Sequence, residues 1–249
     1  MATTTHDPAT YDPTTQPASA IAKSEAPYNY DRFHADLYDF EDFDAPRVGE
    51  RFRDAALWTL DGERVQLSDY LGDKPLVLET GSITCPMYAA SAGPMQDIAA
   101  RYADRLNFVL MYVREAHPGE RTKAHADFEA KIAAAGRSAA RHGDRRTTLV
   151  DDPDGTAHRL WGAMPNSVFV IAPDGTVIYR TMWNNPDKLD PILGEIARGQ
   201  SVEADDLKPV PPFSLHATRT LLVGGWWALW DFYAGLVGLV GKHKKKGTM

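Results

Sequence analysis

The stretch PLVLETGSITCPMYAA, residues 75–90, decides the fold of this chain. PLVLET is an apolar run of the kind that forms a strand buried inside a sheet. Pro86 suits the first turn of a helix, where no backbone N–H is needed. Cys85, the only cysteine in 249 residues, lies between the two. The stretch therefore predicts a buried strand, a short turn and a helix that begins directly after Cys85.

The segments around this stretch predict alternating strands and helices. Upstream, ALWTLDGERVQL (56–67) has the alternation of a β-hairpin, with its turn at Asp61-Gly62. Downstream, the patterns predict a helix (86–104), a buried strand (105–113), a polar helix (120–141), a strand (147–150), a hairpin (162–181) and a closing helix (187–198). This order is typical of an α/β fold with a mixed central sheet flanked by helices.

Composition divides the chain into four predicted parts. Residues 1–44 are an N-terminal extension, partly disordered because its first 27 residues are rich in Thr, Pro, Ala and Asp. Residues 45–200 are the α/β domain. A Pro-containing linker (201–214) and a hydrophobic C-terminal helix with a basic end (215–249) follow it.

Charge and cysteine usage exclude several classes of function. A net charge of −7, with no basic stripe, argues against nucleic-acid binding. A single cysteine excludes an internal disulfide, a Cys-rich zinc site and a self-contained dithiol pair. The N-terminal segment lacks the apolar core of a secretory signal, so we expect a cytoplasmic protein. His125, His142 and His158 lack metal-ligand spacing, so we expect no metal site and interpret them as surface residues.

The position of Cys85 favours a reactive thiol. Backbone N–H groups at the start of the helix are expected to stabilise a thiolate and to lower the pKa of the thiol. Ser82 and Thr84 supply hydroxyls within one turn of the sulfur. The alternative is a buried cysteine that acts as a small hydrophobic residue.

A second polar group follows the next strand, in MYVREAHPGE. Tyr112, Glu115 and His117 leave the carboxyl end of a strand that we expect beside the Cys-bearing one. Sites in open α/β sheets form outside these strand ends. We therefore expect His117 to act as a proton donor beside Cys85, with the carboxylate of Glu115 orienting its ring.

Three motifs carry a family resemblance over residues 48–198. GSITCP resembles the Gly-Ser-x-Thr-selenocysteine-Pro turn of iodothyronine deiodinases, and YVREAHP resembles their Tyr-Ile-Glu-Glu-Ala-His segment. WGAMPNSVFVIAPDGTVIYR resembles a third segment of that family, beginning Tyr-Gly-Ala. The resemblance implies a thioredoxin-like fold for residues 45–200, in which Pro165 is a cis-proline facing the active sulfur.

The resemblance also assigns roles to residues. It places Cys85 at the position of the catalytic selenocysteine, with Ser82 and Thr84 beside it. It places Tyr112, Glu115 and His117 at the proton-supplying and substrate-contacting positions. The sequence departs from the family pattern after the Gly-Ala segment. Asn166 and Ser167 stand there in place of an arginine that grips the substrate in the family.

The implied reaction is the reductive deiodination, or dehalogenation, of an iodinated phenol by a nucleophilic cysteine. No bound cofactor is expected. An external thiol reductant, such as a thioredoxin or a low-molecular-weight thiol, is required because no second cysteine can resolve the oxidised Cys85. Two alternatives stay open: a peroxiredoxin-like thiol peroxidase, for which Ser82 meets the requirement for a hydroxyl three residues before the cysteine, and a non-catalytic thiol sensor or binding protein.

The C-terminal tail has its own pattern. Residues 221–241 carry one charge, Asp231, and the basic run KHKKK follows them. Helical spacing puts small residues on one stripe and Trp and Tyr on another, which suits a membrane interface. We favour a peripheral contact with the inner face of the membrane. Docking on the protein's own domain or across a homodimer is the alternative, and a membrane-spanning helix is a third.

Overall fold

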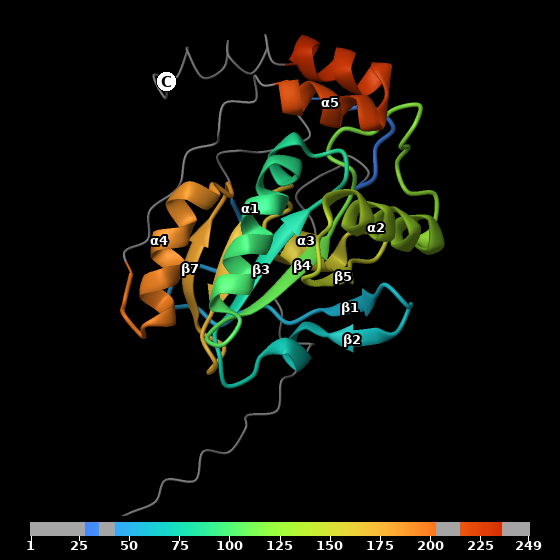
Figure 1. Cartoon of the computed structure of the whole chain (residues 1–249). Helices are drawn as coiled ribbons and strands as arrows, with labels where there is room; N and C mark the ends of the chain where they lie inside the picture. The colour runs from blue at the N-terminus through green and yellow to red at the C-terminus, as the bar shows by residue number, and fades with distance from the viewer. Residues whose placement is uncertain (1–27, 35–42, 203–214, 236–249) are drawn as a thin grey trace, which may run out of the picture.

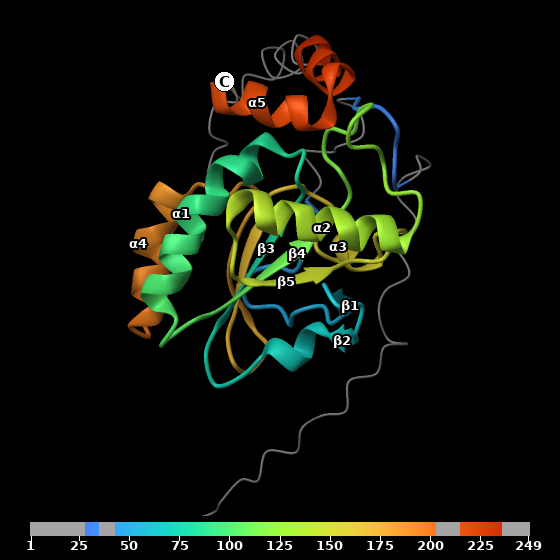
Figure 2. The same cartoon turned by 45° about the vertical axis from the view of Figure 1, so that its right-hand side comes forward.

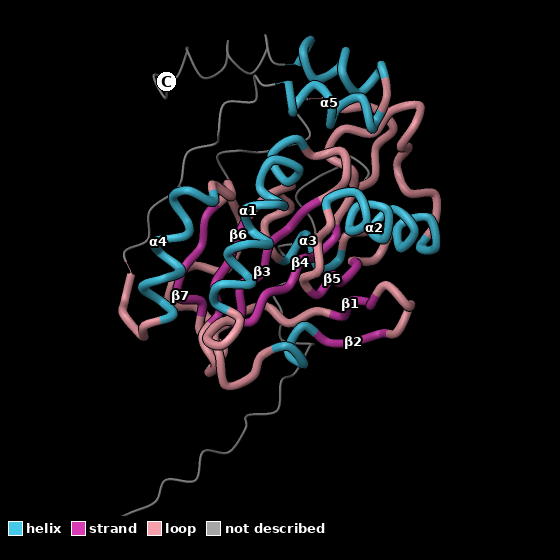
Figure 3. Tube along the Cα trace, in the orientation of Figure 1, coloured by secondary structure: helices cyan, strands magenta, loops and turns pink. Residues whose placement is uncertain are grey.

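A seven-stranded sheet runs through the protein in the order β2-β1-β5-β4-β3-β6-β7 (Figures 1 and 3). The computed structural model describes residues 28–34, 43–202 and 215–235. The strands are β1 (Ala56–Thr59), β2 (Arg64–Gln66), β3 (Leu76–Gly81), β4 (Asn107–Tyr112), β5 (Thr147–Val150), β6 (Val168–Ile171) and β7 (Val177–Thr181). The helices are η4 (Leu67–Tyr70), α1 (Pro86–Tyr102), α2 (Phe128–His142), α3 (Thr156–Leu160), α4 (Pro186–Ala197) and α5 (Leu215–Gly224).

The pairing of the strands is that of a thioredoxin-like fold. β3 is parallel to β4, and β4 is parallel to β5, with α1 as the crossover between β3 and β4. β6 runs antiparallel to β3 and to β7, and α4 follows β7. The predicted fold class, a mixed sheet flanked by helices, is confirmed.

Alternation along the strands builds a core on each face of the sheet. Leu76 and Leu78 of β3 pack on one face with Trp161, which follows α3. Val77, between them, packs on the other face against α1 and α4. Figure 2 shows α1, α2 and α4 together on this second face and α3 on the opposite one. All of β3 is therefore buried, and its end delivers Cys85 into the interior.

The polar helix is shorter than predicted, since α2 begins at Phe128 rather than near residue 120. The side chain of Asp127 accepts a hydrogen bond from the N–H of Ala130 at 2.8 Å and caps the helix there. Glu120 instead binds the C-terminal part of the chain, where its carboxylate accepts the N–H groups of Trp226 and Trp227. Residues 120–127 are consequently a loop.

The C-terminal segment is broken into two helices. α5 ends at Gly224, and Gly225 has a φ of 124°, a conformation open only to glycine. A second helical segment, residues 226–235, follows and is called the aromatic helix below. Within the described residues no helix is long and apolar enough to cross a membrane. The predicted linker around Pro211 and the basic run lie outside those residues.

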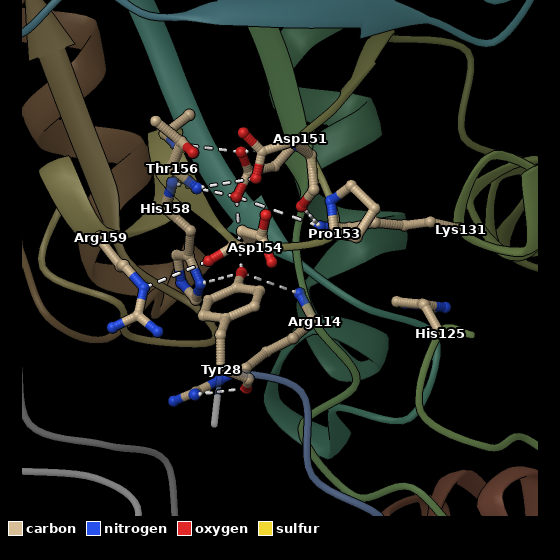
Figure 4. A network of polar contacts seen from close by, with 12 residues as sticks. Tyr28, Arg114, His125, Lys131, Asp151, Pro153, Asp154, Thr156, His158 and Arg159 are labelled. Atoms are coloured by element: carbon tan, nitrogen blue, oxygen red, sulfur yellow. Dashed lines mark hydrogen bonds and ion pairs between the residues drawn. The ribbon is translucent and has the colours of Figure 1, made fainter. Parts of the chain in front are cut away.

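The N-terminal segment 28–34 is anchored on the domain by its first residue (Figure 4). The hydroxyl of Tyr28 lies 2.7 Å from Nδ1 of His158 and accepts the N–H of Arg114 at 3.3 Å. Arg114 in turn donates to the carbonyl oxygen of Tyr28 at 2.9 Å. The ring of Tyr28 fills the space that a side chain at Gly155 would need. His158 is fully buried, so its interpretation as a surface residue is wrong.

Candidate active site

Cys85 is the N-cap of α1, as the order of strand, turn and helix predicted. Its Sγ accepts the N–H of Tyr88 at 3.5 Å, and its side chain is buried with 2% of its surface exposed. Burial raises the pKa of the Cys85 thiol to about 12, although the N–H groups of Tyr88 and Met87 lower it. The expectation of a lowered pKa is therefore wrong for this conformation, because desolvation of a thiolate exceeds the stabilisation by the helix start.

The turn before Cys85 is bound to the loop after β4. The N–H of Ala116 donates to Oγ of Ser82 at 3.2 Å, and the N–H of His117 donates to Oγ1 of Thr84 at 3.1 Å. These bonds form because β3 and β4 are parallel neighbours that end at the same edge of the sheet. The two predicted groups of residues are thus brought together.

Glu115 is the centre of the polar contacts at this edge. It is buried, and Oε2 accepts both the hydroxyl of Thr84 at 2.6 Å and its backbone N–H at 3.2 Å. Oε1 accepts the hydroxyl of Tyr112 at 2.5 Å, and this hydroxyl accepts the N–H of Ile83 at 3.3 Å. Burial raises the pKa of Glu115, and the bonds from Thr84 and Tyr112 oppose that rise. A carboxyl group held in this way is suited to store and pass a proton.

His125 completes the group and was missed by the sequence analysis. Its Nε2 lies 3.4 Å from Oε1 of Glu115, within ion-pair distance but without the geometry of a hydrogen bond. It is buried rather than on the surface, and burial lowers its pKa to about 3. Nothing in the sequence indicated this role, because the pattern around His125 predicts a polar helix. The segment is a loop instead, and the ring of His125 lies in the interior.

No hydrogen bond or ion pair between described residues joins the ring of His117 to Glu115, so the expected contact between them is not present in this structure. The ring packs instead against Phe33, with centroids 4.4 Å apart, and against Phe232, at 5.1 Å. Burial lowers the pKa of His117 to about 3, with Asp231 opposing it, and Nδ1 has no hydrogen-bond partner among the described residues. The ring is therefore neutral near pH 7.

Segment 28–34 and the aromatic helix cover this edge of the sheet, and the two are called the cover below. Arg32 donates two hydrogen bonds of 2.5 Å to the carboxylate of Asp231 and stacks over the ring of Trp227 at 4.6 Å. The chain comes close to the site at Gly224, where a Cβ would lie 2.5 Å from the carbonyl oxygen of His117. Figures 1 and 2 both show the α5 region above the N-terminal end of α1.

Pro165 lies directly before β6 but is not a cis-proline, since the described residues contain no cis peptide bond. The carbonyl oxygen of Met164 is held by the hydroxyl of Thr80 at 2.9 Å and by Nε2 of His158 at 2.8 Å. The next residue, Asn166, is fully buried, and its side-chain amide has no hydrogen-bond partner among the described residues.

A buried ionic cluster supports the site from below. Arg146 donates to the carboxylate of Glu79, in the middle of β3, at 2.5 Å and to Asp144 at 2.6 Å. Asp144 also accepts the hydroxyl of Tyr88, the residue whose N–H binds Cys85, at 3.4 Å. Within the described residues no group of three or more His, Cys, Asp or Glu side chains could hold a metal ion.

Comparison with known proteins gives one family. The iodothyronine deiodinase family model matches residues 30–188. Thyroxine 5-deiodinase of Gallus gallus is 33% identical over 90 residues, which cover 35% of this chain and 34% of that protein. Type I iodothyronine deiodinase of Xenopus laevis is 25% identical over 142 residues, 53% of this chain and 56% of that protein. The chain thus matches between about a third and just over half of the length of these relatives.

Solved structures support the fold alone. A hypothetical protein from Sinorhizobium meliloti 1021 superimposes with a TM-score of 0.54 at 16% identity, over 66% of this chain and 91% of that one. A conserved protein from Geobacillus kaustophilus superimposes with a TM-score of 0.51 at 16% identity, over 69% and 96% of the two chains.

Proposed function

Because the chain belongs to the iodothyronine deiodinase family, an enzyme family, we propose that it removes iodine reductively from an iodinated phenol, with Cys85 as the nucleophile. The observation that carries this proposal is the buried carboxyl group of Glu115, bonded to both the hydroxyl and the N–H of Thr84 immediately before Cys85. It sets a proton-holding group beside the only sulfur nucleophile of the chain.

The deiodination step consumes one thiolate and one proton. The thiolate of Cys85 attacks iodine, the carbon–iodine bond breaks, and its electron pair stays on the ring carbon, which takes up a proton. The products are a deiodinated phenol and a sulfenyl iodide on Cys85. One external thiol then displaces iodide to give a mixed disulfide, and a second thiol releases Cys85 and leaves as the disulfide.

The proton is proposed to come through Glu115. The carboxyl group contacts His125 on one side and the hydroxyls of Thr84 and Tyr112 on the other. A proton can pass between Glu115 and the hydroxyls of Thr84 and Tyr112 without movement of the backbone, because these hydrogen bonds are 2.6 and 2.5 Å long. Nδ1 of His117 has no hydrogen-bond partner among the described residues, and it is proposed to contact the phenol oxygen once the cover has moved. On this proposal His117 contacts the substrate and does not donate the proton.

The proposed substrate class is limited to iodinated phenols. In the family an arginine helps to grip the substrate at the position where this chain has Asn166 and Ser167. The hydroxyl of Ser167 lies 3.1 Å from that of Thr80, and Asn166 is uncharged. Neither residue offers a positive charge, so we expect no preference for a substrate that carries a carboxylate.

Catalysis on this proposal requires an opened cover. In the structure the thiol is buried, and its raised pKa keeps it protonated at neutral pH. Moving the aromatic helix away would readmit water and lower the cost of the thiolate, while the N–H of Tyr88 stays directed at the sulfur.

The experiment is a pair of assays with dithiothreitol as reductant, one for iodide release from an iodinated phenol and one for consumption of hydrogen peroxide. The full-length protein and the Asp231→Asn variant, in which the cover is weakened, are tested together so that a closed cover is not mistaken for inactivity. Iodide release that requires Cys85 supports the proposal. Peroxide consumption without iodide release would assign a thiol peroxidase, and the absence of both would leave a thiol sensor or binding protein.

A further inference from the structure

The aromatic helix exposes four large aromatic side chains to solvent. Trp226, Trp227, Trp230 and Tyr233 have 65%, 53%, 69% and 37% of their surface exposed. Val48 is the one other exposed large hydrophobic residue in the part of the chain that the structure describes. These four residues are called the aromatic face. Exposed tryptophans gathered on one short helix mark a surface that another apolar phase covers.

This exposure is a fixed feature of the fold. Ala228 and Phe232 lie on the other side of the helix and are buried. The first turn is capped by the carboxylate of Glu120, which accepts the N–H of Trp226 and, at 3.1 Å, that of Trp227. The middle of the helix is held by the bonds between Asp231 and Arg32. With these contacts in place the helix presents the aromatic face outward.

The charges nearest to this face favour an anionic partner. The two acidic residues that hold this helix, Glu120 and Asp231, are already bound, one to backbone N–H groups and one to Arg32. In the sequence the helix is followed, from residue 242, by Lys, His and three further Lys. Trp and Tyr side chains beside a run of lysines are the combination that prefers the boundary between headgroups and acyl chains of an anionic bilayer.

We propose that the aromatic face is a docking surface for an anionic lipid bilayer, on which the helix lies without crossing it. Gly225 breaks the apolar run of the tail, and Asp231, within the second helical segment, is paired with Arg32 of the domain. The three tryptophans and Tyr233 enter the headgroup boundary, and the positive charge of the lysine run in the sequence favours anionic lipids. Phe232, on the reverse of the helix, keeps its contact with His117, so the cover lies between the bilayer and the candidate site.

Vesicle flotation of the full-length protein tests this proposal. Phosphatidylcholine vesicles with about a third phosphatidylglycerol are compared with pure phosphatidylcholine at physiological salt. We expect the protein to float with the anionic vesicles at least tenfold more than with the neutral ones. The double variant Trp226→Ser/Trp230→Ser should lose most of this binding, and Val48→Ser, which removes an exposed apolar side chain elsewhere, should keep it.

A second variant separates the two parts of the surface. Replacing Lys242, Lys244, Lys245 and Lys246 by Gln removes the positive charges of this run and should abolish the preference for anionic over neutral vesicles. The proposal is overturned if the wild type does not float, or if the tryptophan and lysine variants float as the wild type does. Light scattering that shows a dimer lost in Trp226→Ser/Trp230→Ser, without any flotation, would overturn it in favour of a second copy of the chain.

Discussion

Arg32 and Asp231, 199 residues apart in the chain, are joined by two hydrogen bonds of 2.5 Å, and their neighbours Phe33 and Phe232 both contact the ring of His117. The pair ties the two halves of the cover together at the candidate site. Arg32 has 41% of its side chain exposed, so water screens the pair and its strength is modest. This ion pair between Arg32 and Asp231 is called the latch below. Because it is weak, thermal motion can break it and open the cover.

Breaking this latch should expose the thiol. In Asp231→Asn the charge of the acceptor is lost, and we expect Cys85 to react with iodoacetamide at pH 7 several times faster than in the wild type. Asp44→Asn breaks a surface pair of the same type, in which Asp44 lies 3.3 Å from Arg53, and should leave the rate unchanged. Equal rates in the wild type and Asp231→Asn would show that the latch does not control access.

Thr84 should matter for its hydroxyl rather than for its size. Thr84→Val keeps the shape and removes the bond of 2.6 Å to Glu115, so we expect turnover of an iodinated phenol to fall roughly 10²-fold with little change in KM. Thr84→Ser restores the hydroxyl and should restore most of the activity. The pH profile of kcat should also change in Thr84→Val, which a purely structural role would not produce.

The buried histidines predict a loss of stability in acid. The pKa values of His117 and His125 are lowered to about 3, below their value in an unfolded chain, so the unfolded state binds more protons between pH 6.5 and 3. The free energy of unfolding must therefore fall as the pH falls through this range, by about 1.4 kcal/mol per pH unit for each such histidine. The raised pKa of Asp151, about 6, acts in the opposite direction.

Urea unfolding between pH 7 and pH 4.5 measures this dependence. His125→Gln should reduce the slope by about one proton, because the side chain no longer titrates. His34→Gln alters an exposed histidine and serves as the control. An unchanged slope in His125→Gln would mean that this ring is not held neutral in the folded protein.

The ionic cluster under the site should be costly to break. Arg146→Met leaves the carboxylates of Glu79 and Asp144 buried without their cation, which should lower the free energy of unfolding by about 3–5 kcal/mol. Arg145→Met, at an exposed neighbouring position, should change it by less than about 0.5 kcal/mol. Thermal unfolding of the two variants compares them directly; equal stabilities would contradict the assignment.

The fold could be predicted from local patterns because they are strong here. The apolar run of β3 and the Pro86 start of α1 specify a strand, a turn and a helix whatever surrounds them. The same patterns brought Ser82, Thr84, Tyr112 and Glu115 to one edge of the sheet, where hydrogen bonds now join them.

The sequence-based predictions that were wrong concern features that depend on contacts between distant parts of the chain. The pKa of Cys85 is set by its burial, and no local motif reports that burial. His125 lies in the segment 120–127, which is a loop bound to the aromatic helix through Glu120 and not part of the predicted helix. The continuous periodicity of the tail predicts a single helix, but the helix is broken at Gly225.

A single-turnover experiment tests the central claim, that Cys85 takes the iodine itself. Full-length protein is mixed with excess iodinated phenol in the absence of thiol, and the deiodinated phenol and free iodide are measured separately. We predict at most one equivalent of deiodinated phenol per Cys85, with the iodine retained on the protein until dithiothreitol releases it as iodide, and no product from Cys85→Ser. Deiodinated phenol formed equally by Cys85→Ser would contradict the account.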